Sequence, residues 1–381
     1  MPALPDQTMR AVRDAVRVAE AHYSLSIDGH RVHPVHIEEA VRGELNADPT
    51  VRGLQREAVA YLKAERFLAG RVAGEAQLDL SAAAFLKVVH WELYARVPEE
   101  FRWIEEPGPP PVKLRIVAGE LRAHAMTTRE HPVAPDMVEP MLGRFRSLYE
   151  LTRLSPVERI VAAAGAHHRL LWIRPFTGGN GRVARLYTAS FLQRAGITGA
   201  LLGAWSMSRG LARGRDRYRL LLRAADQPQR NELEGRDLLS PRALADFTRF
   251  FLETCREEIA FMRHALRADT LTQRINHYVG LRATGLAPGG QLHPESAALL
   301  RDVAIRGEVP RGEAGRITGM ATSEARKVLS ALVKERLLVS DSPKGPVRIG
   351  LPSHAVPFLI PDLYPGDLAF QAVPSSAIEA A

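Results

Sequence analysis

The most informative stretch of this 381-residue chain is Trp172-Ile173-Arg174-Pro175-Phe176-Thr177-Gly178-Gly179-Asn180-Gly181-Arg182-Val183-Ala184-Arg185. Apolar residues lead into a glycine-rich turn, and a helix is expected to begin near Gly181. Glycines allow a tight turn and let backbone N–H groups approach a ligand closely. The positive end of the helix, with its unpaired N–H groups, would point back into the turn. This arrangement predicts a phosphate-binding site.

Two arginines strengthen that interpretation. Arg182 and Arg185 are three positions apart, so they share one helix face and could contact the same polyanion. Asn180 could hydrogen-bond to a ligand or hold the shape of the loop. A Gly-Gly-Asn-Gly turn is also common in ordinary loops, so the pattern alone equally fits a structural helix start.

This stretch resembles the signature of the Fic (Fido) family, H-x-F-x-[D/E]-G-N-G-R-x-x-R. Six of its eight specified positions are present: Phe176, Gly179, Asn180, Gly181, Arg182 and Arg185. Arg174 stands where the family has its histidine, and Gly178 stands where it has an acidic residue.

The resemblance implies a function. Members of the family usually transfer AMP from ATP to a hydroxyl of a target protein. Their histidine is the general base, their carboxylate holds Mg²⁺, and the turn and arginines bind phosphates. The residues that would bind the nucleotide here are Gly179, Asn180, Gly181, Arg182, Arg185 and, near the base, Tyr218. The implied partners are a nucleotide and a target protein.

The two departures bear on catalysis. Arginine stays protonated because its pKa lies above ~12, so Arg174 cannot act as a base. General-base assistance typically contributes about 10²–10⁴-fold. Gly178 offers no oxygen to Mg²⁺, which makes Mg²⁺ doubtful as a cofactor. We therefore expect ATP or another nucleotide to bind while AMP transfer is lost, weak or altered. An active transferase working by another route remains an alternative.

A second resemblance lies near the N-terminus. Helical spacing is expected over residues 11–23 and is expected to end at Ser24-Leu25-Ser26-Ile27-Asp28-Gly29. That segment is similar to the inhibitory motif of Fic proteins, [S/T]-x-x-x-E-[G/N], whose glutamate pairs with the second signature arginine. Asp28 would be the inhibitory residue and Arg185 its partner. An Asp-Gly turn between two helices is the alternative interpretation.

Composition limits the class of protein. The chain is 46% hydrophobic and 25% charged, as in a soluble globular protein. Its single cysteine, Cys255, excludes internal disulfides. Residues 1–13 lack a signal-peptide core, and no apolar run approaches the roughly 20 residues of a membrane helix. These features predict a cytoplasmic protein without membrane contact. The formal charge of +8 permits nucleic-acid binding.

The expected fold is mainly α: a Fic-like helical bundle with a small β-hairpin flap, followed by a C-terminal winged helix. Further helices are expected at 35–45, 51–68, 80–94, 137–149, 156–171 and 247–262. The expected domains are an N-terminal helical region (1–105), the Fic core (106–265), a linker (266–291), the winged helix (292–350) and a tail (351–381) whose end, 374–381, is expected to be disordered.

The expected flap lies between two proline-containing stretches. Residues 106–111 are expected to be a break, and residues 114–128 are β-compatible. This segment resembles the Fic flap that docks the target protein by strand addition. Gly119 and Arg122 match a Gly-x-x-Arg that often opens it. A plain surface hairpin is an equally good interpretation.

Two adjacent histidines precede the signature. His167 and His168 point to different faces of a helix, so they are poorly placed to hold one metal ion. Packing or hydrogen bonding is the expected role, and no metal site is predicted.

The C-terminal region resembles a winged helix. Residues 294–305 are expected to be helical, residues 311–317 and 323–332 form a helix-turn-helix around Gly319, and residues 337–339 and 347–349 form a hairpin. The charge from 301 to 348 is ten basic against six acidic residues, +4. The candidates for DNA contact are Arg326, Lys327, Lys344 and Arg348. This makes a DNA-binding regulator, with the Fic core as ligand sensor, the second functional hypothesis. A dimerisation or docking module, and hence a homodimer, is the alternative use of this domain.

Overall fold

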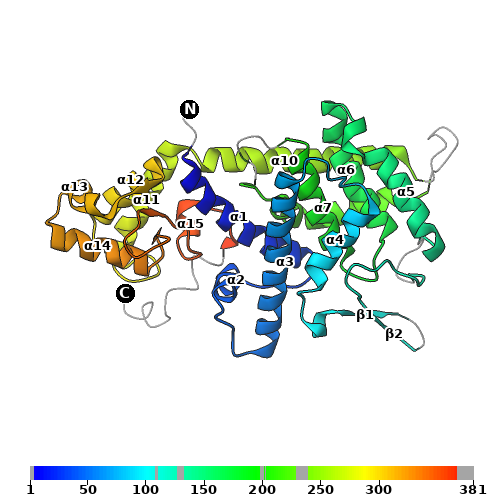
Figure 1. Cartoon of the computed structure of the whole chain (residues 1–381), viewed down its shortest axis with the longest axis horizontal. Coiled ribbons are helices and arrows are strands. Elements are labelled where there is room, and N and C mark those ends of the chain that lie inside the picture. Colours follow the sequence, from blue (N-terminus) through cyan, green and yellow to red (C-terminus); the bar gives the residue numbers. More distant parts are fainter. Residues whose placement is uncertain are drawn as a thin grey trace. The chain divides into compact units, whose positions relative to one another are not determined.

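The computed structural model describes residues 4–107, 110–126, 133–197, 201, 203–228 and 239–366. Its described part is mainly helical, with two small antiparallel sheets (Figure 1). The chain divides into two compact units. We call Glu20–Leu202 with Ser206–Glu258 the core unit, and Met1–Ala19 with Gly203–Trp205 and Ile259–Ala381 the terminal unit.

The core unit is built around helix α7, Asn180–Arg194, most of whose side chains are buried. It packs against α6, α3 and α4. Two of these neighbouring helices begin at capping side chains. Asp48 caps the start of α3, and Ser155 and Glu158 form a capping box at the start of α6. The other helices that lie in or enter the core unit have these bounds: α1 Asp6–Ile27, α2 Pro34–Val41, α3 Pro49–Gly74, α4 Ala83–Tyr94, α5 Val138–Tyr149, α6 Pro156–Ile173, α8 Met207–Arg213, α9 Arg215–Ala225 and α10 Pro241–Ala265.

Helix α1 continues beyond its expected end. It includes Ser24 to Ile27, because Leu25 and Ile27 are buried and prolong its apolar face. The turn comes one residue later, at Asp28 and Gly29, where Gly29 has a φ of +97°. Asp28 therefore directly follows the last residue of α1.

The hairpin lies earlier in the chain than the sequence suggests. Strand β1, Trp103–Glu106, pairs antiparallel with β2, Val112–Arg115, and Trp103 lies opposite Arg115. Of the expected β segment 114–128, Leu114 and Arg115 lie in β2, and Glu106 of the expected break lies in β1. Prolines lack the N–H that a ladder needs, and Pro107, Pro110 and Pro111 lie between the two strands. Residues 127–132 of the expected flap lie outside the described residues.

The terminal unit contains a short three-stranded sheet in the order β3-β5-β4, with antiparallel pairs. The sequence did not predict strand β3. The elements of this unit, in chain order, are α11 Ala268–Ala283, α12 Ser296–Arg306, β3 Glu308–Val309, α13 Ala314–Thr318, α14 Thr322–Lys334, β4 Leu338–Val339, β5 Val347–Ile349 and α15 Val356–Leu359.

The segment expected to be a linker, 266–291, holds helix α11. Its residues Leu271, Ile275 and Tyr278 are buried at helical spacing. Arg282 is also buried, and its Nη2 lies 2.7 Å from Glu335 Oε2. This stretch is therefore packed structure and not a flexible connection. Tyr364, in the segment expected to be a tail, is buried. The end that was expected to be disordered, 374–381, lies outside the described residues.

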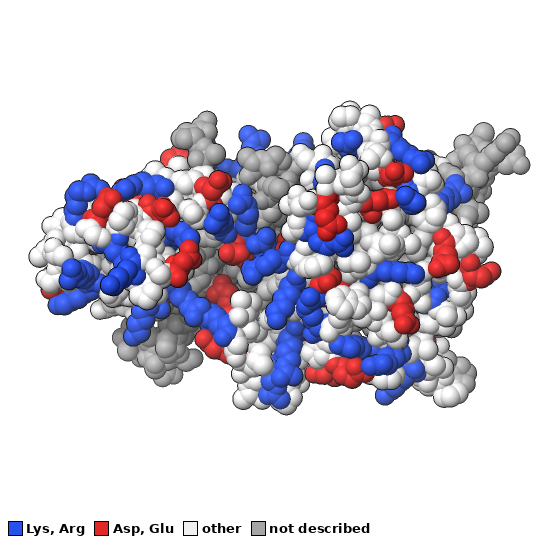
Figure 2. Space-filling model, in the orientation of Figure 1, with Lys and Arg blue, Asp and Glu red and all other residues white. Residues whose placement is uncertain are grey.

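Charge is mixed over the visible face of the molecule. Figure 2 shows basic and acidic side chains interspersed over α13 and α14 as well as over the core unit. Within the described ranges, none of the helices combines the length and the apolar character needed to cross a membrane.

Candidate functional site

The glycine-rich loop begins where α6 ends. Arg174 caps that end in the left-handed conformation, with a φ of +46°, and Gly179, with a φ of +71°, precedes α7. The side chain of Asn180 holds the loop together. Its Oδ1 accepts a hydrogen bond from the Phe176 N–H at 3.0 Å, and its Nδ2 donates to the Phe176 carbonyl at 2.8 Å. Of the two roles considered for Asn180, these bonds are those of a loop holder.

Phe176 anchors the loop in the core. It is buried and stacks on His90, with ring centroids 4.0 Å apart and ring planes 4° apart. Burial lowers the pKa of His90 to about 3, so its ring is neutral near pH 7. His90 Nδ1 accepts a hydrogen bond from the Gly119 N–H at 2.8 Å. Gly119 thus supports the loop through its backbone.

Side chains cover the glycine turn directly. A Cβ added at Gly178 would lie 2.4 Å from Ile116 Cδ1, and one at Gly179 would lie 2.2 Å from Tyr94 Cε2. These two residues therefore cover the turn on the side to which a Cβ at Gly178 or Gly179 would point. Tyr94 Oη is buried and has no hydrogen-bond partner among the described residues.

Arg185 is held by the end of α1. Its side chain is 1% exposed, and its Nε donates to Ser24 Oγ at 2.7 Å. Its Nη2 donates to the Ser24 carbonyl and to Asp28 Oδ2, both at 2.9 Å. Asp28 reaches Arg185 although aspartate is one methylene shorter than glutamate.

Arg182 is buried beside Arg185 and pairs with two carboxylates. Its Nε lies 3.3 Å from Asp28 Oδ2, and its Nη1 donates to Glu57 Oε1. Its guanidinium also lies 5.5 Å from the centroid of the Tyr94 ring. Burial opposes the charge of Arg182, but the nearby Tyr94, Glu57 and Asp28 more than offset it and raise its pKa. One Asp28 oxygen therefore bridges both arginines.

Glu57 is a site residue that the sequence reasoning missed. It projects from α3 and is fully buried, and its Oε2 lies 2.6 Å from His30 Nδ1. The sequence did contain a pattern that could have identified Glu57. It lies on the same helix face as Gly53, Ala60 and Ala64, which are small or apolar. An acidic residue on such a face needs a buried partner.

The Glu57–His30 contact makes stability depend on pH. The hydrogen bond to Glu57 is the largest cause that raises the pKa of His30 above its ordinary value. A group with a raised folded pKa contributes stability that is complete below its unfolded pKa, about 6.5, and is lost as pH rises through the folded pKa. We expect NMR to show His30 titrating above 6.5. The unfolding free energy should fall in that window, and His30→Gln should flatten the slope; an unchanged slope would contradict the assignment.

Tyr218 and the paired histidines belong to the interior of the core unit. Tyr218 Oη lies 2.8 Å from His167 Nε2, and His167 Nδ1 lies 2.9 Å from Thr188 Oγ1. Burial lowers the pKa of His167 to about 3. His168 Nε2 lies 3.2 Å from Asp226 Oδ1. His167 is hydrogen-bonded and His168 is buried beside Asp226, which agrees with the predicted packing or hydrogen-bonding role. Tyr218 is buried, and its place near a nucleotide base stays a prediction.

Arg122 supports the end of α6 and does not belong to an exposed flap. It is buried, and its Nε donates to the Arg174 carbonyl at 2.8 Å. Its Nη2 donates to the Val133 carbonyl at 2.6 Å. The last carbonyls of a helix lack intrahelical partners, and a buried arginine satisfies them here. The docking of a target by the segment that Gly119 and Arg122 open stays a prediction.

The residues at this site do not fit Mg²⁺. Among the described residues, no group of three or more His, Cys, Asp or Glu side chains could hold a metal ion. Position 178 faces Ile116 and Ile104, which offer no oxygen ligand. Asp28 and Glu57 are bound to arginines.

Restoring an acid at position 178 should strain the loop. Gly178→Asp is expected to lower the unfolding free energy by about 1–3 kcal/mol, because its Cβ overlaps Ile116. Ile116→Ala in the same chain should recover part of the loss. Urea denaturation measures both, and Gly70→Asp is the control, since nothing lies within 4 Å of a Cβ there. A loss no larger than the control's would show that the loop is not tightly covered.

The DNA-contact candidates lie in the terminal unit. Arg326 and Lys327 are exposed on α14, and Lys344 is exposed between β4 and β5. Lys327 Nζ lies 2.9 Å from Glu324 Oε1, and Arg348 pairs with Asp341. Acidic neighbours thus offset part of this positive charge.

Part of the core unit is similar to a known protein family. Residues 79–192 match the model of the Fic/DOC family. The protein adenylyltransferase Fic of Nematostella vectensis is 35% identical over 83 residues, which are 22% of this chain and 19% of that protein. Its counterpart in Drosophila melanogaster is 34% identical over 82 residues, 21% of this chain and 17% of that protein. The matched segment thus spans less than a fifth of the length of these relatives.

A solved structure has a similar fold. A Fic domain-containing signalling protein from Bacteroides thetaiotaomicron superimposes with a TM-score of 0.51 at 15% identity, covering 69% of this chain and 91% of that one. This likeness supports the mainly helical fold. It carries no information about the ligand.

Proposed function

We propose that this chain, which carries a Fic/DOC family domain at residues 79–192, is a nucleotide-binding protein whose phosphate site is closed by its own Asp28. The observation on which this proposal rests is that Asp28 Oδ2 lies 3.3 Å from Arg182 Nε and 2.9 Å from Arg185 Nη2. A nucleotide phosphate would compete for these same guanidinium groups. Asp28 is then an inhibitory residue, and its displacement opens the site.

The chemistry of the buried donors supports a phosphate ligand. Guanidinium groups bind phosphate oxygens through paired, charge-assisted hydrogen bonds. Tyr94 Oη is buried without a hydrogen-bond partner among the described residues, and Arg182 Nε, which lies 3.3 Å from Asp28 Oδ2, makes an ion pair there but no hydrogen bond. Buried donors of this kind are usually satisfied in a complete site. They are additional donors for phosphate oxygens once Asp28 has moved.

Calorimetric titration with ATP and ADP, each with and without Mg²⁺, tests the proposal. We expect binding that Mg²⁺ changes little, because position 178 lacks an oxygen ligand. Arg185→Gln should weaken it. The absence of binding to both the native chain and Asp28→Asn under every condition would reject the proposal.

AMP transfer by the usual route requires a base that this chain lacks at position 174. The relatives are named protein adenylyltransferases. For this chain we infer that transfer to a protein hydroxyl is absent or slow, since arginine cannot accept the proton. Incubation with labelled ATP and a cell lysate should leave proteins unlabelled. Labelling that Arg185→Gln abolishes would establish a transferase instead.

A second candidate function concerns the terminal unit. We infer that residues 292–350 form a winged helix, because the order α12, β3, α13, α14, β4, β5 with a three-stranded antiparallel sheet fits that module. Arg326, Lys327, Lys344 and Arg348 would contact DNA phosphates. A gel shift with the chain's own upstream DNA should weaken as salt rises. Salt-independent binding, or dimerisation without DNA binding, would favour the docking alternative.

A further inference from the structure

A separate cavity lies in the core unit between α5, α6 and the start of α10. Its volume is about 260 Å³, and none of its lining residues belongs to the loop at 174–181. Arg144 and Leu148 on its α5 side are exposed, so solvent reaches it there. The lining residues are Met141, Arg144, Phe145, Leu148, Tyr149, Arg169, Trp172, Ile173, Leu239 and Leu244.

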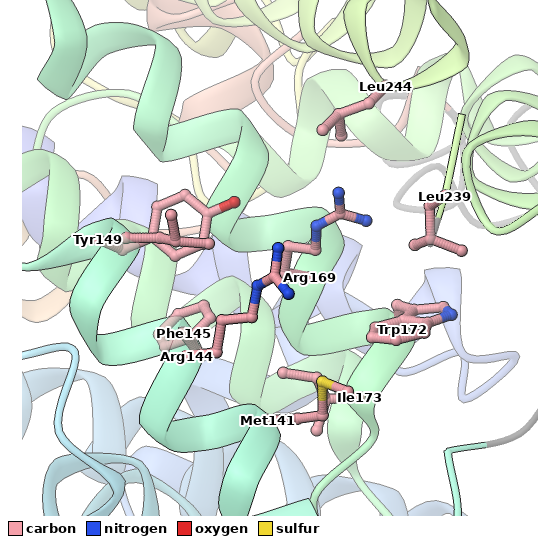
Figure 3. A pocket seen from close by; sticks show the side chains of 10 residues that line it. Met141, Arg144, Phe145, Tyr149, Arg169, Trp172, Ile173, Leu239 and Leu244 are labelled. Carbon is pink, nitrogen blue, oxygen red and sulfur yellow. The ribbon is translucent and has the colours of Figure 1, made fainter. Parts of the chain in front are cut away.

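The lining combines apolar walls with positive charge. Figure 3 shows the guanidinium groups of Arg144 and Arg169 in the middle of the view, between Tyr149 on one side and Trp172 on the other. No acidic side chain is among the described residues that line the cavity. The Arg169 guanidinium, in a lining whose described residues include no carboxylate, favours an anion at that place.

Arg169 and Trp172 present unused donors. Arg169 Nη1 and Trp172 Nε1 are buried and have no hydrogen-bond partner among the residues that the structure describes. The Arg169 guanidinium lies 6.0 Å from the centre of the Trp172 ring, which is within the range of a cation–π interaction. A buried charged donor without an acceptor is costly, so an acceptor brought by a ligand would relieve that cost.

We propose that this cavity binds a small organic anion, a carboxylate carried on an aromatic body. The carboxylate accepts hydrogen bonds from Arg169, and the ring packs among Trp172, Phe145 and Leu244. The cavity is slightly smaller than the roughly 300–1,000 Å³ of pockets for drug-sized ligands, which limits the body to about one ring. The site is distinct from the phosphate site and does not depend on the function proposed for it.

Phenylacetate and its neutral analogue phenylacetamide are the probes that test this site. Isothermal titration of the full chain should show phenylacetate binding about 10- to 100-fold more tightly, as expected for one charge-assisted hydrogen bond. Arg169→Gln should reduce the affinity for phenylacetate to that for the amide. Leu244→Trp, which fills the cavity, should weaken both probes.

The control variant is Arg146→Gln. It removes a cation from α5 whose side chain pairs with Asp79 and does not line the cavity. It should leave both affinities unchanged, and thermal unfolding of each variant checks its folding. Equal binding of acid and amide, no binding of either, or a preference for the acid that survives Arg169→Gln would overturn the proposal.

Discussion

Asp28→Asn is expected to tighten the binding of ATP by about 10- to 100-fold, the range that corresponds to one lost charge-assisted hydrogen bond. In the native chain, the Asp28 carboxylate occupies Arg182 and Arg185. A phosphate must displace it and leave it close to another anion. Asparagine keeps the shape of the side chain but removes the negative charge, so the competition becomes weaker.

Stability provides a second measure of the same variant. Arg185 is 1% exposed, and Asp28 is the carboxylate that pairs with it. A buried charge that loses its partner is destabilising, so Asp28→Asn without ligand should unfold at a lower temperature. ATP should then raise its unfolding temperature more than it raises that of the native chain.

The control is Asp14→Asn on α1, the helix that ends just before Asp28. Asp14 is exposed and lies 3.1 Å from Arg17, far along the chain from the site. Calorimetry should give this variant the nucleotide affinity of the native chain. If Asp28→Asn and Asp14→Asn bound ATP equally, Asp28 would not be an inhibitory residue.

Glu57→Ala is expected to lower the unfolding free energy by about 3–5 kcal/mol, which is the usual result of removing one partner from a buried ion pair. Glu57 is fully buried between Arg182 and His30. Its loss leaves the buried Arg182 with Asp28 as its remaining carboxylate, at 3.3 Å. Glu57→Gln retains an acceptor and should have an intermediate effect.

Urea denaturation of the two variants measures this effect. Glu75→Gln is the matched control, because Glu75 directly follows the same helix and forms an exposed pair with Arg71. Exposed pairs contribute little, so this change should leave the midpoint nearly unaltered. A midpoint for Glu57→Ala as high as that of the control would show that Arg182 does not need a buried counter-charge.

Much of the fold could be predicted because its signals are local. Apolar spacing located most helices, and the Gly-Asn-Gly turn located the start of α7. Proline was harder to interpret: the run at 106–111 suggested a break, whereas its first residue, Glu106, pairs with Val112 in the hairpin. A helix also occupies residues 268–283 of the expected linker, because the burial of Leu271, Ile275 and Tyr278 outweighs the neighbouring loop signals.

The sequence by itself determined the arginine pair, the missing base and the candidate inhibitory aspartate. Only the tertiary structure decided what surrounds the arginines. Arg182 contacts Glu57 across 125 positions, and Arg185 contacts Asp28 across 157. Propensity and periodicity describe neighbours within one element, so neither reveals which distant helix supplies a counter-charge. For the same physical reason, the contacts that Tyr94 and Ile116 make over Gly179 and Gly178 depend on packing between elements.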